Sequence, residues 1–145
     1  MSDLPTFVTI NEEGPREGFQ IEPGPISTAD KIKLIDALSE TGLKNIQACS
    51  FVNTRLVPGW ADAEAVVEGF KAVKGIKYTG LYFNGNGLDR ALKYQGKLTL
   101  SGSISLTASE EFTKKNLNRS HAENVAAMKR PVSYTHLTLP TICSV

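Results

Sequence analysis

The sequence predicts an α/β fold of about four consecutive strand–helix units with parallel strands. Three features of residues 1–130 support this prediction: short apolar runs alternate with amphipathic stretches, glycines separate them, and the alternation repeats along the chain. That pattern is typical of βα units. Four units fit half of a TIM (β/α)8 barrel, which needs eight units and about 250 residues, or a small doubly wound sheet. Length alone favours the sheet, whereas a truncated chain favours the barrel.

The composition is that of one soluble globular domain. The chain has 145 residues, 41% hydrophobic and 21% charged, with a formal net charge of +1. No strong positive field attracts nucleic acid or an anionic membrane. Two cysteines without a CxxC motif exclude a disulfide framework and favour a reducing compartment. Because we find neither a signal peptide nor a bilayer-spanning run, we expect a cytoplasmic protein without nucleic-acid or membrane partners.

The four predicted strands are the short apolar runs of the chain. They span residues 7–10, 43–51, 76–83 and 97–105. The first of them leads into residues 11–25, which are polar and rich in glycine and proline, and which we therefore predict to be a loop.

The helix after this loop has the clearest signals. Ser27, with Asp30 three residues later, is a plausible N-terminal cap. Apolar residues then recur on one helical face between residues 32 and 38, and Gly42 ends the helix.

Three further helices are predicted. The second spans residues 61–72, and the third is a short helix that follows a turn at residues 84–87 and ends at Leu92. Ser120 and Glu123 form a capping box, which predicts that a fourth helix begins there.

Residues 131–145 differ from the rest of the chain. They contain no Asp, Glu, Lys or Arg, whereas all 31 formal charges lie in residues 1–130. Residues 132–141 resemble the translation of an adapter used in preparing sequencing libraries. We therefore expect a non-native tail, with uninformative His136 and Cys143, on a domain of residues 1–130 whose natural protein is longer. The alternative is a natural strand around Tyr134 and His136.

The most informative segment is GPREGFQ, residues 14–20, directly after the first predicted strand. Active sites of parallel α/β folds form at the carboxyl ends of strands. A glutamate such as Glu17 supplies an oxygen ligand suited to Mg²⁺ or Mn²⁺, and the Arg16 guanidinium neutralises an oxyanion. An isolated arginine–glutamate pair is, however, also typical of a solvated surface loop.

The chain resembles the hydroxymethylglutaryl-CoA lyases, which are part of the wider group of metal-dependent aldolase and pyruvate carboxyltransferase-type TIM barrels. Four segments in order carry the resemblance: residues 14–20, 27–43, 50–58 and 109–120. Several collinear segments are more specific than one motif. The resemblance implies that residues 1–130 are the N-terminal half of a TIM barrel.

The resemblance also implies a chemistry. Enzymes of this family use a divalent metal, here Mg²⁺ or Mn²⁺, for retro-Claisen cleavage of 3-hydroxy-3-methylglutaryl-CoA to acetyl-CoA and acetoacetate, as in leucine breakdown. The implied partner is an acyl-CoA, and the full-length parent could be a homo-oligomer. Three alternatives stay open: a Claisen-condensing acyltransferase, a lyase for a related 3-hydroxyacyl-CoA, and an inert fragment or acyl-CoA-binding module.

The resemblance assigns roles residue by residue. Arg16 is the catalytic partner of the enolate, and Glu12 is a catalytic residue that supports the site from the end of the first strand. Glu17 is the metal ligand, at a position where the family usually has aspartate. Gln20 and Gln47 bind substrate.

Two departures bear on the substrate. Gln47 replaces a glutamate that is typical of the lyases, and Pro23 replaces a common lysine. The His-x-His and asparagine metal ligands of the family, and its cysteine in a glycine-rich loop, lie later in the barrel and have no match here.

The remaining candidates have simpler explanations. We predict that Cys49 is a small buried hydrophobe, that His121 is a solvated first-turn residue and that Trp60 serves packing. Lys114 and Lys115 are either surface residues or contacts for CoA phosphates.

Overall fold

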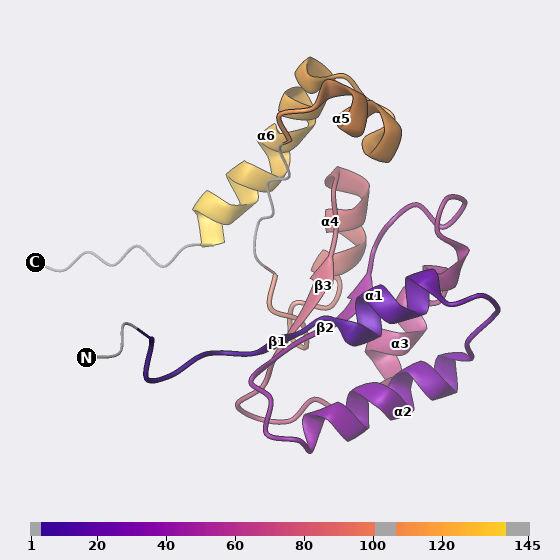
Figure 1. The fold of residues 1–145 in the computed structure, drawn as a ribbon, viewed down its shortest axis with the longest axis vertical. Helices are drawn as coiled ribbons and strands as arrows, with labels where there is room; N and C mark the ends of the chain where they lie inside the picture. The colour runs from indigo at the N-terminus through magenta and orange to yellow at the C-terminus, as the bar shows by residue number, and fades with distance from the viewer. Residues whose placement is uncertain (1–3, 101–106, 139–145) are drawn as a thin grey trace, which may run out of the picture.

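The computed structural model describes residues 4–100 and 107–138 and confirms a parallel α/β arrangement (Figure 1). Its sheet has the order β1-β2-β3, with β1 at Asn11–Glu12, β2 at Asn45–Ser50 and β3 at Lys77–Leu81. Both neighbouring pairs are parallel, and the second pair has a register shift between Gln47 and Cys49. Parallel neighbours joined through helices are what consecutive βα units produce.

Seven helical segments accompany the sheet within the described residues. They are α1 (Gly14–Ile21), α2 (Thr28–Ser39), the 3₁₀ helix η1 (Pro58–Trp60), α3 (Ala63–Gly69), α4 (Gly85–Leu92), α5 (Glu110–Leu117) and α6 (His121–Thr138). The predicted helices that follow Ser27, that span residues 61–72 and that end at Leu92 correspond to α2, α3 and α4, but α4 begins at Gly85, inside the predicted turn at residues 84–87. The predicted cap of α2 is confirmed, because the Ser27 side chain accepts a hydrogen bond from the Asp30 backbone nitrogen at 3.1 Å.

The core lies between the sheet and the helices that follow its strands. Alternate residues of β2 point to opposite faces, so Ile46 and Ala48 are fully buried while Gln47 is only half-buried on the other face. The larger core side chains are Ile35, Ile46, Phe51, Trp60, Val66, Val67, Phe70, Tyr78, Tyr82 and Leu88.

The first strand was predicted in the wrong place. Residues 7–10 form no strand, and Phe7, Val8 and Ile10 are 80%, 68% and 62% exposed. Within the described residues, the sheet begins with β1, which pairs only with β2. An apolar run becomes a strand only where a neighbour supplies hydrogen bonds, and residues 7–10 have none in this sheet.

The predicted loop over residues 11–25 was also wrong, because it contains β1 and α1. Pro15 occupies the first turn of α1, where its fixed φ angle suits a helix and its missing N–H costs no hydrogen bond. The glycines and proline that suggested a loop are therefore compatible with a short helix. The GPREGFQ segment lies on that helix.

The chain after β3 differs from its prediction in two further ways. Residues 97–100 form no strand, although the Thr99 backbone nitrogen donates to the Tyr78 oxygen at 2.7 Å; the rest of that predicted strand, residues 101–105, lies outside the described residues. Helix α5 was missed. The Ser109 side chain caps its start, and Asn118, at a φ of 51°, ends it in the left-handed region.

The capping box of α6 is confirmed. The Ser120 backbone nitrogen donates to the Glu123 carboxylate at 2.8 Å, and the Glu123 nitrogen donates back to the Ser120 hydroxyl at 3.2 Å. Since α6 continues to Thr138, the alternative of a strand around residues 134–136 is wrong.

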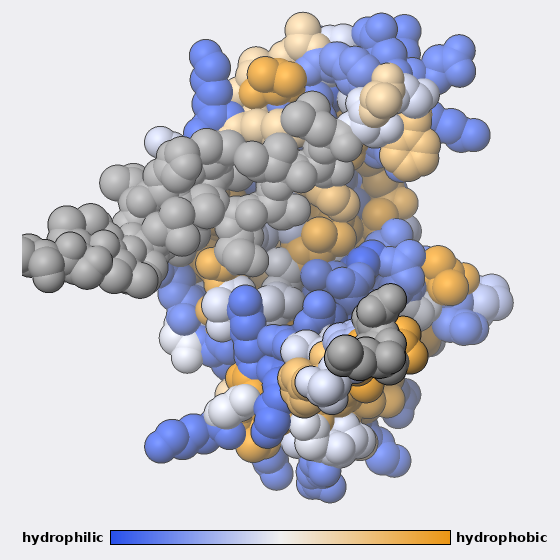
Figure 2. All heavy atoms as spheres, turned by 60° about the vertical axis from the view of Figure 1, so that its left-hand side comes forward, coloured by the Kyte–Doolittle hydropathy of each residue, from blue (hydrophilic) through white to orange (hydrophobic). Residues whose placement is uncertain are grey.

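Figure 2 shows apolar side chains interspersed with hydrophilic ones over the visible face, from its upper end to its lower part. None of the helices among the described residues is long and apolar enough to cross a bilayer.

Candidate functional site

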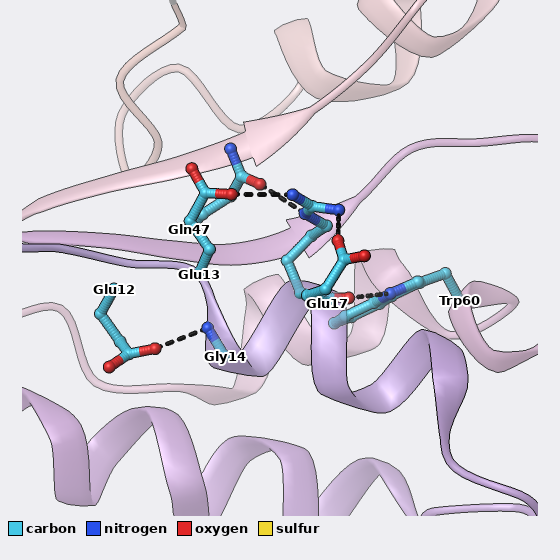
Figure 3. A network of polar contacts seen from close by, with 7 residues as sticks. Glu12, Glu13, Gly14, Glu17, Gln47 and Trp60 are labelled. Atoms are coloured by element: carbon cyan, nitrogen blue, oxygen red, sulfur yellow. Dashed lines mark hydrogen bonds and ion pairs between the residues drawn. The ribbon is translucent and has the colours of Figure 1, made fainter.

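Arg16 is the centre of the candidate site. It lies in the first turn of α1, directly after β1, and its side chain is 15% exposed. Its Nε donates to Gln47 Oε1 of β2 at 2.6 Å, one terminal nitrogen donates to Glu13 Oε2 at 2.8 Å, and the other contacts Glu17 Oε2 (Figure 3). The structure therefore brings together three of the predicted site residues, Arg16, Glu17 and Gln47.

The carboxylates around Arg16 are exposed. The Glu13 and Glu17 side chains are 52% and 51% accessible. Exposed ion pairs contribute about 0–1 kcal/mol, because water screens the charges and both side chains lose rotamer freedom. The carboxylates can therefore exchange partners, whereas the Nε contact to a half-buried side chain of the sheet anchors the guanidinium.

The backbone of Arg16 is held by Trp60. The indole nitrogen donates to the Arg16 carbonyl oxygen at 3.0 Å, and the fully buried Trp60 ring packs 6.1 Å from the Phe19 ring. The approach of η1 to α1 requires glycine at position 59, because a Cβ there would lie 2.8 Å from the Phe19 oxygen. The prediction that Trp60 serves packing is confirmed, and the ring also fixes the start of α1.

Lys31 and Asp62 form a largely buried ion pair next to Trp60. Lys31 Nζ lies 5.0 Å from the Trp60 ring centre and donates to the Gly59 oxygen at 2.5 Å and to Asp62 Oδ1 at 2.6 Å. The Lys31 side chain is only 3% exposed. A charge this far from water requires a partner, so the pair ties α2 to the segment that carries Trp60.

The surroundings of Asp62 stabilise its charged form. Burial by itself raises the pKa of this carboxyl, but hydrogen bonds from Lys31 and Thr28 and the lysine charge outweigh it, so the net pKa lies below the ordinary value. Asp62 is therefore ionised at neutral pH and keeps the pair with Lys31 intact.

Glu12 does not join the Arg16 cluster. Its Oε1 accepts a hydrogen bond from the Gly14 nitrogen at 2.5 Å, and Figure 3 shows its carboxylate turned away from the guanidinium. This contact satisfies a free N–H at the start of α1. Glu12, Glu13 and Gln47 nevertheless line one cavity of about 190 Å³. The catalytic role assigned to Glu12 stays a prediction.

The metal-ligand role of Glu17 also stays a prediction. Among the residues that the structure describes, no three His, Cys, Asp or Glu side chains come together in a way that could hold a metal ion. Divalent cations such as Mg²⁺ take about six oxygen ligands. The described donor set therefore does not fit a complete metal centre.

Gln20 lies elsewhere. It is exposed at the far end of α1 and lines a cavity of about 330 Å³ between the segments after β2 and β3 and helix α5. The other lining residues include Asn53, Phe83, Phe112 and Arg119, and neither Arg16 nor Gln47 is among them. Gln20 is thus not brought together with the other predicted substrate ligand.

Three further candidates are placed by the structure. Cys49 is fully buried, and burial raises the pKa of its thiol, so it is a small buried hydrophobe as predicted. His121 begins α6 as predicted, but the prediction that it is solvated was wrong for its Nε2, which is buried and lacks a hydrogen-bond partner among the described residues. Lys114 and Lys115 are exposed in the last turn of α5.

Sequence reasoning missed Glu13, Lys31 and Asp62. The spacing of Glu13 and Arg16 is that of an i,i+3 helical pair, which becomes visible only when α1 is recognised as a helix. Lys31 and Asp62 are 31 residues apart, so no local pattern connects them.

Comparison with known proteins gives consistent matches. A hydroxymethylglutaryl-CoA lyase of Bacillus subtilis is 40% identical over 126 residues, which cover 87% of this chain and 41% of the relative. A mitochondrial hydroxymethylglutaryl-CoA lyase of Macaca fascicularis is 46% identical over 124 residues, which cover 86% and 37%.

The fold matches as well. The solved HMG-CoA lyase of Acinetobacter baumannii, in complex with coenzyme A and 3-methylmalate, superposes with a TM-score of 0.79 at 31% identity. That match covers 95% of this chain and 44% of the relative, and no protein-family model matches. The chain thus spans about two fifths of the length of the curated relatives it matches.

Proposed function

The chain is homologous to hydroxymethylglutaryl-CoA lyases over about two fifths of their length, and on this premise we propose that it forms part of a carbon–carbon lyase for an acyl-CoA. The proposed reaction is the retro-Claisen cleavage of 3-hydroxy-3-methylglutaryl-CoA, or a close 3-hydroxyacyl-CoA, to acetyl-CoA and acetoacetate or the matching ketone. Coenzyme A in the solved relative supports this substrate class.

The observation that carries the proposal is the anchored Arg16 guanidinium. Removal of the proton from the tertiary hydroxyl breaks the carbon–carbon bond, and the acetyl group departs as a thioester enolate whose oxygen bears negative charge. Such a charge is stabilised by a donor that is held in position before the reaction. Three of the five N–H groups of Arg16 donate to Gln47, Glu13 and Glu17, which leaves two for an oxyanion.

We assign the substrate residues to two places. Gln47 positions Arg16, and its neutral amide offers the site less negative charge than a glutamate there. The cavity beside Gln20 has room for part of an acyl-CoA, since ligand pockets typically measure about 300–1,000 Å³ and this one measures about 330 Å³.

A divalent metal, Mg²⁺ or Mn²⁺, is part of the proposal. A bound ion would supply Lewis-acid polarisation of a substrate oxygen. Glu17 is the described residue that we assign to it, and the exposed carboxylate would have to exchange its contact with Arg16 for the ion. One carboxylate does not hold a metal ion, so further ligands would have to come from outside the residues that the structure describes.

The proposal is tested with a chimera. Residues 1–130 replace the matching segment of the Bacillus subtilis lyase, and formation of acetyl-CoA from 3-hydroxy-3-methylglutaryl-CoA is measured. We expect metal-dependent activity, and a loss of about 100- to 1,000-fold in kcat for Arg16→Gln, the usual cost of removing an oxyanion donor. Lys33→Gln removes an exposed charge from α2 and serves as the matched control. A folded chimera that is inactive, or an active one that tolerates Arg16→Gln, contradicts the proposal.

The isolated chain of 145 residues should lack lyase activity, since its described residues form no complete metal centre. The measurement is acetyl-CoA release by the purified chain at saturating Mg²⁺ or Mn²⁺. Metal-dependent turnover would contradict this expectation.

The proposal extends to the domain boundary, the metabolic role, the location and the oligomeric state of the parent protein. We propose a domain of residues 1–130 followed by a non-native tail, a role of the parent in leucine breakdown, a cytoplasmic location and possible homo-oligomers. A human relative named as cytoplasmic supports the location. Sequencing the uninterrupted gene from its source tests the domain boundary directly.

A further inference from the structure

Glu13 is a carboxylate of the Arg16 cluster to which the proposed function gives no role. It follows β1 directly and stands at the N-cap of α1, where a side-chain oxygen usually accepts a free backbone N–H of the helix. The Glu13 side chain makes no such bond, and Glu12 Oε1 accepts the Gly14 nitrogen instead. Glu13 Oε2 accepts from Arg16 at 2.8 Å, so this side chain serves the guanidinium and not the helix start.

Glu13 and Gln47 approach Arg16 from adjacent strands. In the parallel register of β1 and β2, Glu12 lies opposite Ile46. The next residues along the two segments, Glu13 and Gln47, are therefore neighbours, and both line the cavity of about 190 Å³. Figure 3 shows both side chains directed at the guanidinium, where Gln47 accepts from Nε and Glu13 accepts from a terminal nitrogen. Because the guanidinium is planar and rigid, acceptors on two different nitrogens fix its orientation.

Glu13 is also the carboxylate that stays with Arg16 in the proposed reaction. Glu17 has to exchange its contact with Arg16 for the metal ion, and Gln47 is neutral. The Arg16 side chain is only 15% exposed, so water screens its charge less than it screens the charge of a surface arginine. Of the three described acceptors, Glu13 then supplies the negative charge that keeps the guanidinium in place.

We propose that Glu13 is a positioning residue, which together with Gln47 holds the Arg16 guanidinium in the orientation that the enolate oxygen needs. The inference rests on the proposed function and adds that one carboxylate and one amide, at positions 13 and 47, hold the oxyanion donor. A donor that is oriented beforehand lowers the barrier because it does not have to reorganise during the reaction. The two positions should be exchangeable, since both face the same planar group.

The first test measures kcat and KM of the chimera with 3-hydroxy-3-methylglutaryl-CoA. Glu13→Gln removes the carboxylate, and we expect kcat to fall about tenfold, the usual effect of losing one charge-assisted contact. Gln47→Glu places a second carboxylate beside the first, where the like charges repel each other, and should also lower kcat. KM should change little in both, because the lost interaction acts in the transition state.

The double variant Glu13→Gln/Gln47→Glu exchanges the two side chains and keeps one carboxylate and one amide. We expect its kcat to return to within about threefold of the unmodified chimera, which is the coupling that a double-mutant cycle detects. A substitution that merely damages folding is not repaired by a second one. Glu40→Gln removes an exposed carboxylate at the end of α2 and serves as the matched control, with unchanged kcat.

The second test needs no activity and uses the whole chain, labelled with ¹⁵N. The terminal N–H signals of the Arg16 guanidinium are followed at low temperature and identified by their loss in Arg16→Gln. These signals are separate when rotation of the guanidinium is restricted. We expect separate signals in the unmodified chain and in the double variant, and merged signals in Glu13→Gln.

Three results would overturn the inference: a Glu13→Gln chimera as active as Glu40→Gln, a double variant no more active than the single ones, or Arg16 signals that are the same in Glu13→Gln and in the unmodified chain. The two proposals can fail separately. An active chimera that tolerates Glu13→Gln would reject this inference alone. An inactive unmodified chimera, with Arg16 signals that merge in Glu13→Gln of the whole chain, would reject the lyase activity and keep Glu13 as the residue that holds Arg16.

Discussion

Arg16 and Lys31 are two cations in neighbouring parts of the fold that meet their carboxylates in opposite surroundings. The partners of Arg16 are about half exposed, whereas Lys31 is 3% exposed and its partner Asp62 is 25% exposed. Trp60 connects the two, since it packs near Lys31 and donates to the Arg16 backbone. The contrast shows that burial, and not the pairing of charges, decides which pair is a structural anchor and which is free to meet a ligand.

The largest expected effect comes from breaking the buried pair. Lys31→Met retains much of the side-chain volume but leaves Asp62 without its cation. We expect a loss of about 3 kcal/mol in the free energy of unfolding, the usual cost of removing one partner of a buried pair. Urea denaturation followed by circular dichroism measures it. A loss below about 1 kcal/mol would show that this pair behaves like a surface pair.

Acidification is expected to have an intermediate effect on the free energy of unfolding. The pKa of Asp62 lies below its ordinary value in the folded chain. A carboxyl with a depressed folded pKa contributes stability above its unfolded pKa, and this contribution is lost as the pH falls through the folded pKa. We therefore expect the free energy of unfolding to drop as the pH falls below about 4, the ordinary pKa of an aspartate.

The Asp62→Asn variant identifies the source of this acid effect. It should be less stable at neutral pH and should lose less stability on acidification than the unmodified chain. Urea unfolding at about pH 5 and about pH 3 compares the two. Equal pH dependence in both proteins would assign the acid effect to other carboxyls, for example Glu64, whose pKa is lowered mainly by its hydrogen bonds from Arg90.

The smallest effect is expected at the exposed pair. Glu17→Gln removes a carboxylate that is half in water, so the free energy of unfolding should change by less than about 0.5 kcal/mol. The same denaturation experiment gives the value, and Glu13→Gln is the matched variant on the other side of Arg16. A loss near that of Lys31→Met would remove the distinction between the two pairs.

Local sequence patterns predicted much of the fold correctly. Ser27 and Ser120 mark the starts of α2 and α6 because a hydroxyl oxygen at that point accepts a free backbone N–H, whatever the rest of the chain does. The buried β2 was predicted from its apolar run, and Arg16 and Gln47 were named as site residues through a family resemblance.

The incorrect predictions of strands and helices have a different cause. Residues 7–10 have the composition of a strand but no partner in this sheet, and α1 was hidden by residues that are common in loops. Neither strand pairing nor helix packing is a property of the segment alone, since both depend on what lies beside it.

The sequence by itself therefore determined the α/β class, the parallel strands and most helix starts, because these follow from periodicity and capping. Only the tertiary structure decided which charges are buried, that Lys31 and Asp62 stand behind Trp60, and that Arg16 meets Gln47. Those features arise from contacts between segments about 30 residues or more apart in the chain, which no local pattern encodes.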